Sequence, residues 1–145
     1  MVSHPDSTCP FCEIANGRAP VVRIYETSKV LAFLPLAPAT TGHTLVIPKA
    51  HITDLWHADM RSLTPVMEAS LVVSQALKKA FSPDGLNLIN SAGRAASQTV
   101  FHLHIHLVPR WNDDQVGDFW PESAHWGESK RATVAERIRR NIGGA

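Results

Sequence analysis

Three histidines at every second position of an apolar segment constrain this chain more than any other feature of its sequence. The segment 101–108 reads Phe-His-Leu-His-Ile-His-Leu-Val. Side chains of a strand alternate between its two faces, so a strand over 100–108 would place His102, His104 and His106 on one face and the apolar residues on the other. Imidazole nitrogens need polar partners when buried, so three in a row predict a functional face and not simple packing.

One metal ion bound by all three histidines is disfavoured by the geometry of a strand. Neighbours on one face lie about 6.6 Å apart, so His102 and His106 would be about 13 Å apart. Zinc holds each nitrogen at about 2.0–2.1 Å. Two neighbours could share an ion, as in a zinc hydrolase that uses His102 and His104, but three could hardly do so. The remaining hypothesis is that different histidines serve different sites.

The composition is that of an ordinary globular chain without a strong electrostatic field. The sequence has 145 residues, of which 44% are hydrophobic and 19% are charged, and its formal net charge is +1. We therefore expect one domain over 1–145 and a main partner that is neither nucleic acid nor a membrane. The N-terminus lacks a signal-peptide pattern, and the longest apolar stretch contains Pro35 and Pro38. These features predict a cytoplasmic protein.

The hydrophobic pattern predicts an α+β fold in which strands are grouped around one long helix. Strands are expected at 23–26, 30–33, 43–47, 86–90 and 100–108, with a loop of small residues at 91–99. Thr64 followed by Pro65 has the form of a helix start, and this helix should end near 83–85. A short last helix is expected at 133–142. The core stripe predicted for the long helix consists of Val66, Met67, Leu71, Leu77 and Phe81.

The segment 98–110, Gln-Thr-Val-Phe-His-Leu-His-Ile-His-Leu-Val-Pro-Arg, resembles the signature of the histidine-triad (HIT) family. Segments 30–34, 42–51 and 85–90 resemble the same family, so the likeness runs from about Cys9 to Arg110 and leaves 111–145 as a C-terminal extension. The resemblance implies a HIT-like fold, with an antiparallel sheet and one long helix packed across it. It also implies a homodimeric enzyme that acts on a nucleotide, with an adenine nucleotide as the expected substrate.

The resemblance further implies a role for each residue of the motif. The middle histidine, His104, is the expected nucleophile. A covalent nucleotidyl-His104 intermediate would divide one displacement at an α-phosphate into two steps. His106 and Gln98 are expected to contact the phosphate or the leaving group. The nucleotide-binding residues expected beside them are Phe33, Asn90, Ser91, Ser97 and Thr99.

Cys9 and Cys12 form a Cys-x-x-Cys pair, which by itself indicates metal binding or redox chemistry in a reducing compartment. This sequence resembles some bacterial HIT proteins that hold zinc with two cysteines and two histidines. The resemblance therefore implies one structural Zn²⁺ per chain, held by Cys9, Cys12, His51 and His102. A reduced cysteine pair beside a hydrogen-bonded His51 is the alternative.

Three positions depart from the family's pattern. Pro35 stands where relatives usually carry Asp or Asn for the ribose hydroxyls, and Ser91 stands where Asn or Gln is expected. Asn90, the residue before it, could replace that contact, and Ser97 stands in place of a common Gly. Because these changes concern nucleotide recognition, a nucleotide-binding regulatory module with little turnover is the alternative to an enzyme.

The predicted homodimer would use the long helix, because Val72, Val73 and Ala76 lie outside the core stripe predicted for it. The extension is rich in aromatic residues, which we expect to pack in the core or in the dimer interface. A wall of the leaving-group pocket is the alternative for them. These aromatic residues are Trp111, Phe119, Trp120 and Trp126.

Overall fold

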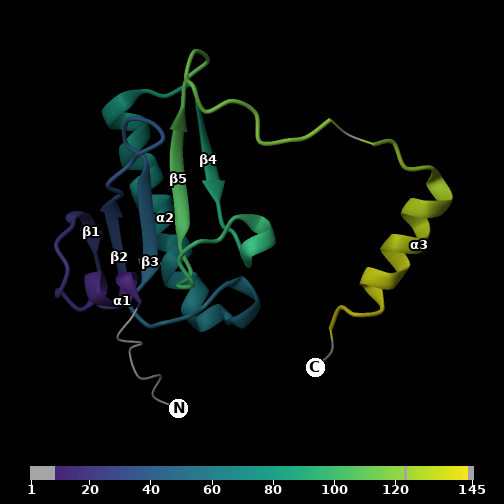
Figure 1. Cartoon of the computed structure of the whole chain (residues 1–145), viewed down its shortest axis with the longest axis horizontal. Helices are drawn as coiled ribbons and strands as arrows, with labels where there is room; N and C mark the ends of the chain where they lie inside the picture. Colours follow the sequence, from purple (N-terminus) through teal and green to yellow (C-terminus); the bar gives the residue numbers. More distant parts are fainter. Residues whose placement is uncertain (1–8, 123, 144–145) are drawn as a thin grey trace.

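The computed structural model describes residues 9–122 and 124–143. The expectation that the chain carries no signal-peptide pattern rests on its first residues, which lie outside these ranges. Five strands form one antiparallel sheet in the order β1-β2-β3-β5-β4. They are β1 (Val22–Glu26), β2 (Val30–Leu34), β3 (Thr44–Pro48), β4 (Gly85–Ile89) and β5 (Ile105–Arg110). The long helix α2 (Met60–Phe81) crosses one face of this sheet, as predicted (Figure 1). None of the described helices is both long and apolar enough to cross a membrane.

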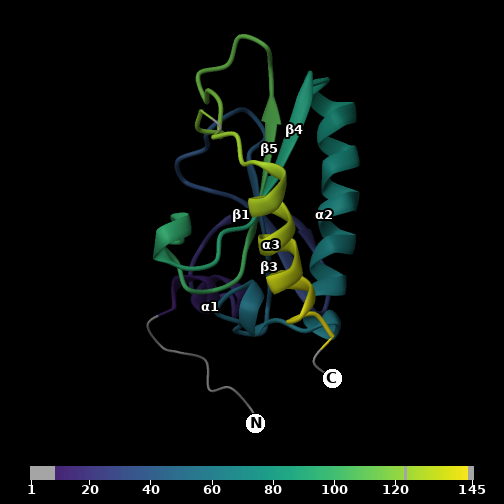
Figure 2. The same cartoon turned by 90° about the vertical axis from the view of Figure 1, so that its right-hand side faces the viewer.

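Seen from the side, the sheet has α2 on one side and the short helix α1 (Pro10–Ala15) on the other (Figure 2). The α2 layer contains a buried aliphatic cluster that includes Val46, Val73 and Leu107. The opposite layer holds α1, whose residues pack with Leu31, Phe33 and other side chains of the sheet. The sequence analysis did not predict α1, because six residues are too few to show a helical period.

The start of α2 differs from the prediction. The helix begins at Met60, where Asp59 caps it: the Asp59 carboxylate accepts the Ser62 N–H at 2.8 Å, and the Ser62 hydroxyl accepts the Asp59 N–H. This reciprocal capping box satisfies two of the donors that a helix start leaves open. Pro65, expected at the first position, lies inside the second turn and removes one backbone hydrogen bond there. The prediction was wrong because the Thr64–Pro65 pattern was preferred to the capping box.

The core stripe of α2 was also assigned incorrectly in part. Met67, Leu71 and Phe81 are 42%, 59% and 44% exposed, whereas Val73, placed outside the stripe, is buried. Apolar residues cover more than one face of this helix, so the pattern alone leaves its rotation ambiguous. Small side chains set the rotation of α2 about its axis, because they let the helix lie close to the sheet. The buried positions are Val66, Ala69, Ser70, Val73 and Leu77.

The third difference concerns the histidine segment. β5 begins only at Ile105, and residues 100–104 bend away from the sheet. The Leu103 N–H donates to the Ile52 carbonyl at 2.6 Å, so this part of the chain pairs with the segment after β3 and not with a strand. As a result Phe101, expected in the core, is 37% exposed, while His102 is fully buried. The alternation of faces is otherwise kept: Leu103, Ile105 and Leu107 lie in the cluster under α2. The rings of His102 and His104 contact Phe11 on the opposite side, and the His106 ring lies beside His104.

Beyond β5 the chain forms the C-terminal extension, which ends in helix α3 (Glu128–Arg139). This helix begins five residues earlier than predicted and has no buried residue. In Figure 1 it stands apart from the sheet, on the side of the edge strand β4. Of the two places expected for the aromatic residues of the extension, the core is excluded for Trp120 and Trp126, which are 84% and 48% exposed. A place in the dimer interface stays a prediction.

Candidate functional site

His102 is the innermost of the three histidines, and its two ring nitrogens face different partners. Nε2 donates to the Pro48 carbonyl at 2.8 Å, since a carbonyl oxygen can only accept. Nδ1 then carries the lone pair, and it lies 3.4 Å from the Cys9 sulfur and 3.5 Å from the Cys12 sulfur. The backbone of β3 therefore orients the lone pair of His102 toward two thiols.

These two thiols and two imidazoles form a compact group of four ligand atoms. The sulfur atoms of Cys9 and Cys12 and one ring nitrogen each of His51 and His102 all lie within 4.8 Å of one another, and Cys12 Sγ is 3.3 Å from His51 Nδ1. A tetrahedral Zn²⁺ site places sulfur and nitrogen ligands about 3.5 Å apart. The three sulfur–nitrogen distances of 3.3–3.5 Å match this spacing. The four residues can hold a metal ion.

His104 lies beside this group but is not part of it. Its Nδ1 donates to the His102 carbonyl at 2.7 Å, which leaves the lone pair on Nε2. The ring is 8% exposed, and the Phe11 ring of α1 contacts it edge to face with centroids 5.1 Å apart. A zinc hydrolase that uses His102 and His104 as ligands is therefore disfavoured, because the lone pair of His102 faces the two thiols and not His104.

His106 is oriented by a histidine that the sequence analysis did not single out. The Ala39 N–H donates to His43 Nδ1 at 3.0 Å, so the proton of His43 sits on Nε2. This Nε2–H donates to His106 Nδ1 at 2.9 Å, and His106 therefore carries its own proton on Nε2. His43 precedes β3, whose Leu45 pairs with His106, so the strand register was the signal that could have found it.

Burial keeps these rings neutral. It lowers the pKa of His104 below its ordinary value of 6.5, although the hydrogen bond to the His102 carbonyl acts in the opposite direction. Burial, with smaller repulsion from His104 and His43, lowers the pKa of His106 to about 4. Burial also lowers the pKa of His43. At neutral pH the site therefore combines a free imidazole lone pair on His104 with an N–H donor on His106.

Asn90 and Gln98 hold the backbone around His104. The Asn90 amide donates to the His104 carbonyl at 2.9 Å. The Gln98 amide donates to the carbonyls of Thr53 and Val100 and accepts the Gly93 N–H. Both amide hydrogens of Gln98 are thus engaged within the loop, and in this structure the side chain is placed to shape the loop and not to face a phosphate.

The other predicted nucleotide contacts differ in how accessible they are. Ser97 and Thr99 are exposed, and Ser91 is half-buried. Ser97 has a φ of 70°, a left-handed backbone that explains why glycine is common there. Phe33 is only 2% exposed and packs edge to face on Phe11, so in this structure it supports the ring that touches His104.

Pro35 follows β2 and is half-buried, and its ring offers no hydrogen bond where relatives have a polar side chain. The loop that it begins returns to His43 through Ala39. Gly42 ends the loop with a φ of +84°, and a side chain there would meet Leu77 and Phe81 at 3.0–3.2 Å. The route of this loop thus depends on a glycine, and the loop carries the backbone donor that orients His43.

The sequence matches a known family over most of its length. The HIT-domain family model covers residues 16–113. "Protein hit" of Bacillus subtilis is 38% identical over 122 residues, which are 83% of this chain and 84% of that protein. The Schizosaccharomyces pombe protein named adenosine 5'-monophosphoramidase hnt1 is 36% identical over 115 residues, 79% of this chain and 84% of that protein.

Solved structures agree with the sequence. The crystal structure of a HIT family member from Bacillus subtilis superposes with a TM-score of 0.89 at 33% identity and covers 96% of this chain and 100% of that chain. A zinc-bound histidine triad family protein from Mycobacterium smegmatis superposes with a TM-score of 0.72 at 36% identity, over 92% of this chain and 98% of that chain. By its sequence, its sheet and its three histidines, this chain belongs to the HIT family.

Proposed function

We propose that this chain is a nucleotide hydrolase or transferase that cleaves at an α-phosphate through a nucleotidyl intermediate on His104. The observation that carries the proposal is the hydrogen bond from His104 Nδ1 to the His102 carbonyl, which leaves the lone pair on Nε2. A neutral imidazole in this tautomer is a good nucleophile near pH 7 and a good leaving group afterwards. Dinucleoside polyphosphates and nucleoside phosphoramidates are the proposed substrate types.

The reaction would take place in two displacements. In the first, His104 Nε2 attacks the α-phosphorus, the new P–N bond forms, and the bond to the leaving group breaks with its electron pair. The departing amine or phosphate takes a proton from solvent. In the second, a water oxygen attacks the same phosphorus, the P–Nε2 bond breaks, and the nucleoside monophosphate leaves while the water's proton goes to solvent. An acceptor other than water would make the same step a transfer.

His106 is proposed to donate its Nε2–H to a phosphate oxygen, because His43 holds it in the tautomer that carries that proton. Donors aimed at developing negative charge are worth most in a site that excludes water. Gln98 and Asn90 are proposed to position the loop and the His104 backbone. Ser91, Ser97 and Thr99 remain the proposed lining of the nucleotide site, and Phe33 is proposed to support that site from below through Phe11.

An adenine nucleotide is the proposed substrate class, supported by the name of the fission yeast relative. Because Pro35 supplies no hydrogen bond to the ribose, we expect weak discrimination between ribonucleotides and deoxyribonucleotides. A protein that binds nucleotides with little turnover is the second candidate function. The missing hydrogen bond at Pro35 is the observation that favours it.

Zinc is the proposed ion for the site formed by Cys9, Cys12, His51 and His102, supported by their spacing and by the zinc-bound relative. When bound, the ion would cross-link α1 to the segment that carries His102, as in structural zinc sites. A homodimer and a cytoplasmic location complete the proposal. Exposed apolar residues of α2 support the first, and the Cys-x-x-Cys pair, a pattern typical of metal binding in a reducing compartment, supports the second.

Trapping the intermediate tests the proposed function. The protein is mixed with an adenosine phosphoramidate, quenched in acid-free denaturant within milliseconds, and digested for mass spectrometry. We expect a mass increase of one nucleoside monophosphate on the peptide that contains His104, and none in a His104→Ala variant. Turnover without any adduct, or an adduct on another residue, would contradict the proposal. Binding without turnover or adduct would support the regulatory module.

A further inference from the structure

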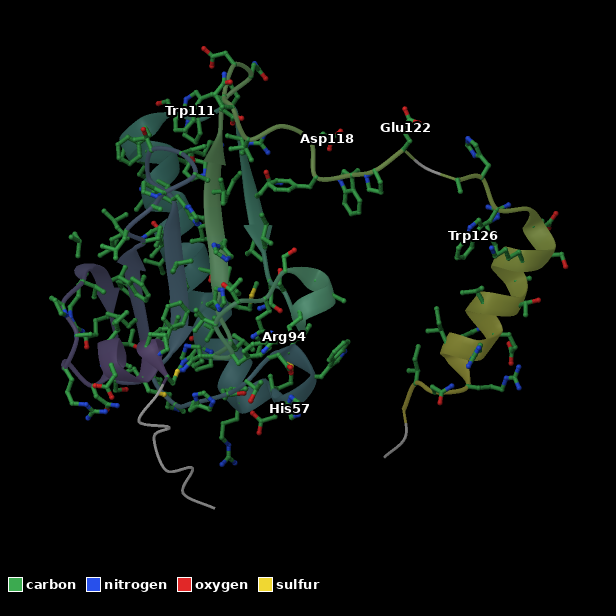
Figure 3. The ribbon with its side chains drawn as sticks, in the orientation of Figure 1. His57, Arg94, Trp111, Asp118, Glu122 and Trp126 are labelled. Atoms are coloured by element: carbon green, nitrogen blue, oxygen red, sulfur yellow. The ribbon has the colours of Figure 1, made fainter. Side chains whose placement is uncertain are left out.

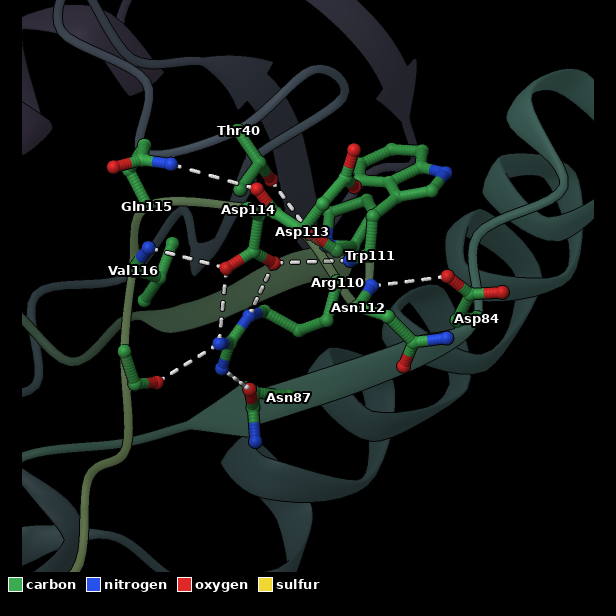
Figure 4. A network of polar contacts seen from close by, with 12 residues as sticks. Thr40, Asp84, Asn87, Arg110, Trp111, Asn112, Asp113, Asp114, Gln115 and Val116 are labelled. Atoms are coloured by element: carbon green, nitrogen blue, oxygen red, sulfur yellow. Dashed lines mark hydrogen bonds and ion pairs between the residues drawn. The ribbon is translucent and has the colours of Figure 1, made fainter.

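Two groups of basic side chains in this protein differ in how their charge is balanced. Where β5 ends, Arg110 contacts both carboxylate oxygens of Asp114, at 2.7 and 3.1 Å (Figure 4). The same guanidinium donates to Asn87 of β4 and to the Gly117 carbonyl, each at 2.8 Å. Arg110 therefore has an anion and two neutral acceptors within its own chain, and it needs no external partner.

The second group lies at the opposite end of the sheet, where Lys29 and Lys49 stand opposite each other just beyond the paired residues of β2 and β3. The Lys49 N–H donates to the Lys29 carbonyl at 2.8 Å. Like charges directly opposite each other on paired strands are destabilising. Lys49 forms an ion pair with Glu26 at 2.7 Å, but the same carboxylate also pairs with Arg23 at 2.8 Å. The backbone therefore holds positive charges together that the nearby carboxylate balances only in part.

Both lysines line a hollow of about 610 Å³ between this end of the sheet and the start of α2. Arg61, in the first turn of α2, adds a third positive charge to the lining. Neither Lys29 nor Arg61 forms an ion pair with another residue that the structure describes. The one carboxylate among the described lining residues, that of Asp59, already accepts the Ser62 N–H. Figure 3 shows His57, another lining residue, at the end of the protein body where α2 begins. The hollow thus carries an excess of positive charge.

His51 also lines this hollow and has one ring nitrogen without a partner in the described part of the chain. Its Nδ1 lies 3.3 Å from the Cys12 sulfur, so Nε2 points away from that thiol. Among the described residues, no buried side-chain nitrogen or oxygen lacks a hydrogen-bond partner, so Nε2 is open to solvent. A histidine that binds a metal ion ordinarily donates its other N–H to an acceptor. An anion in the hollow would supply one.

A second hollow of about 420 Å³ continues from the first, because Ser28, Lys29 and Pro65 line both. Its other walls include the ring of Tyr25 and the aliphatic side chain of Val72, which is 46% exposed. Hollows of this size that combine apolar walls with a few polar groups are typical of small-molecule sites. Together the two hollows fit a ligand with a multiply charged anionic end and a flat apolar end.

We propose that the first hollow binds an oligophosphate group, carried by a nucleoside triphosphate or by inorganic polyphosphate. Lysine binds phosphate as a point charge and arginine as a planar fork, so three such side chains match an anion with several charges. In a nucleoside triphosphate, the nucleoside occupies the second hollow. The lining includes no residue proposed for the reaction at His104, so the inference goes beyond the proposed function and stands or falls separately.

Residue-resolved NMR shows where the anion binds. Inorganic tripolyphosphate is titrated into full-length ¹⁵N-labelled protein, and elemental analysis before and after the titration checks that it has removed no metal ion. We expect the amide signals of residues 29, 49, 51 and 61 to shift together along one saturating curve. Shifts confined to residues 91–99 and 104–106 would overturn the proposal, because they would place the anion at the histidines instead.

Charge-neutral variants measure what the basic side chains contribute. The double variant Lys29→Gln, Arg61→Gln should raise the Kd for tripolyphosphate at least about tenfold in calorimetry, equal to about 1.4 kcal/mol. The double variant Lys79→Gln, Arg131→Gln is the matched control, since it removes the same charge at exposed positions elsewhere, and it should change the Kd less than about twofold. Thermal unfolding checks that both variants are folded. An equal effect of the two variants, or none, would overturn the site.

Comparing ATP with tripolyphosphate distinguishes the two sources of the oligophosphate group. The signals of residues 29 and 61 report on this site even if ATP also binds beside His104. A lower Kd for ATP than for tripolyphosphate at these signals, with the difference lost in Val72→Asp, would identify a nucleoside triphosphate as the ligand. Equal Kd values would identify inorganic polyphosphate. No saturable shift with either anion would overturn the proposal, while the His104 adduct would still test the chemistry.

Discussion

On the side of the sheet that α2 covers, the clustered buried side chains are aliphatic, whereas on the opposite side thiols and imidazoles share the interior with leucine and phenylalanine. Both layers are well buried: Leu107 and His102 each have no exposed surface. The first layer needs only complementary shape. The second needs partners for its polar atoms, and the carbonyls of Pro48 and His102 and the N–H of Ala39 provide one each for His102, His104 and His43.

The difference shows how one fold separates stability from function. Hydrophobic burial on the α2 side is non-directional and tolerates changes in rotation, as the misassigned stripe of α2 illustrates. Hydrogen bonds on the histidine side are directional, and they select one tautomer for each ring. Substitutions in the two layers should therefore have different consequences, and five predictions test this.

The largest expected effect is the loss of activity in His104→Ala. Because the proposed covalent route needs the Nε2 lone pair, kcat should fall at least about a thousandfold, or about 4 kcal/mol. The fold should remain, since the α2 layer is untouched. Steady-state kinetics and thermal unfolding of the same preparation check both points. Retention of more than about 3% of the wild-type kcat, a loss of only about 2 kcal/mol, would exclude His104 as the nucleophile.

Leu77→Ala should show the reverse pattern. Leu77 is 6% exposed under the sheet, and removing its side chain should cost about 2–5 kcal/mol of unfolding free energy, measured in urea. The kcat of the folded fraction should stay within about threefold of wild type, because no atom of the histidine layer is changed. Leu36→Ala, at a fully exposed leucine, is the control and should change stability by less than about 0.5 kcal/mol. A large loss of kcat in Leu77→Ala would show that the two layers are coupled.

Removal of the proposed metal ion should destabilise the histidine layer. With zinc at a hundredfold excess over its dissociation constant, binding adds about 2.7 kcal/mol to the unfolding free energy. Cys9→Ser should therefore lower zinc content below about one ion per chain, together with the melting temperature. Elemental analysis and calorimetry provide the two readouts, with Ser74→Ala on α2 as a control. Wild-type protein purified without chelators yet free of zinc would remove the metal site from the proposal.

Acidification should destabilise the histidine layer specifically. The pKa values of His43 and His106 are lowered by burial, that of His106 to about 4, so between about pH 4 and 6.5 the unfolded chain binds more protons than the folded one. Stability should then fall as the pH drops below 6.5. Urea midpoints at pH 7.5, 6 and 5 measure this slope. His106→Asn should reduce it and His125→Asn, at an exposed histidine, should not; equal slopes in both would contradict the assignment.

The smallest effect is expected at Ser97, where the backbone is left-handed with a φ of 70°. Glycine has no Cβ to clash there, so Ser97→Gly should raise stability by up to about 1 kcal/mol. Ser74→Gly inside α2 should instead lower it by about 0.5–1 kcal/mol, since glycine is a poor helix former. Denaturant titrations of the two variants should therefore shift in opposite directions. A loss of stability in Ser97→Gly would mean that the serine side chain makes a stabilising contact.

The sequence by itself determined the class of the fold and predicted which residues stand at the centre of the site. The alternation of apolar residues and histidines in 101–108 indicated a functional face, and the resemblance to the HIT family assigned His104 its expected role. The same resemblance, added to the Cys-x-x-Cys pair, implied a ligand set with His51 and His102 that the structure brings together. Such signals are local, because they depend on residue types at fixed spacings. The same locality explains why the buried face of α2 was assigned incorrectly in part. Apolar residues recur at helical spacing on more than one face of this helix, so the pattern alone does not say which face is buried.

Only the tertiary structure decided which nitrogen of each histidine ring carries the proton and which carries the lone pair. The tautomers of His102, His104 and His106 depend on the carbonyls of Pro48 and His102 and on a donor in the 35–43 loop, some of them distant in sequence. The engagement of both Gln98 amide hydrogens and the outward course of the extension were likewise invisible in the pattern. Spacing along a chain sets which side chains can share a face, but hydrogen-bond direction depends on backbone groups that folding brings from elsewhere.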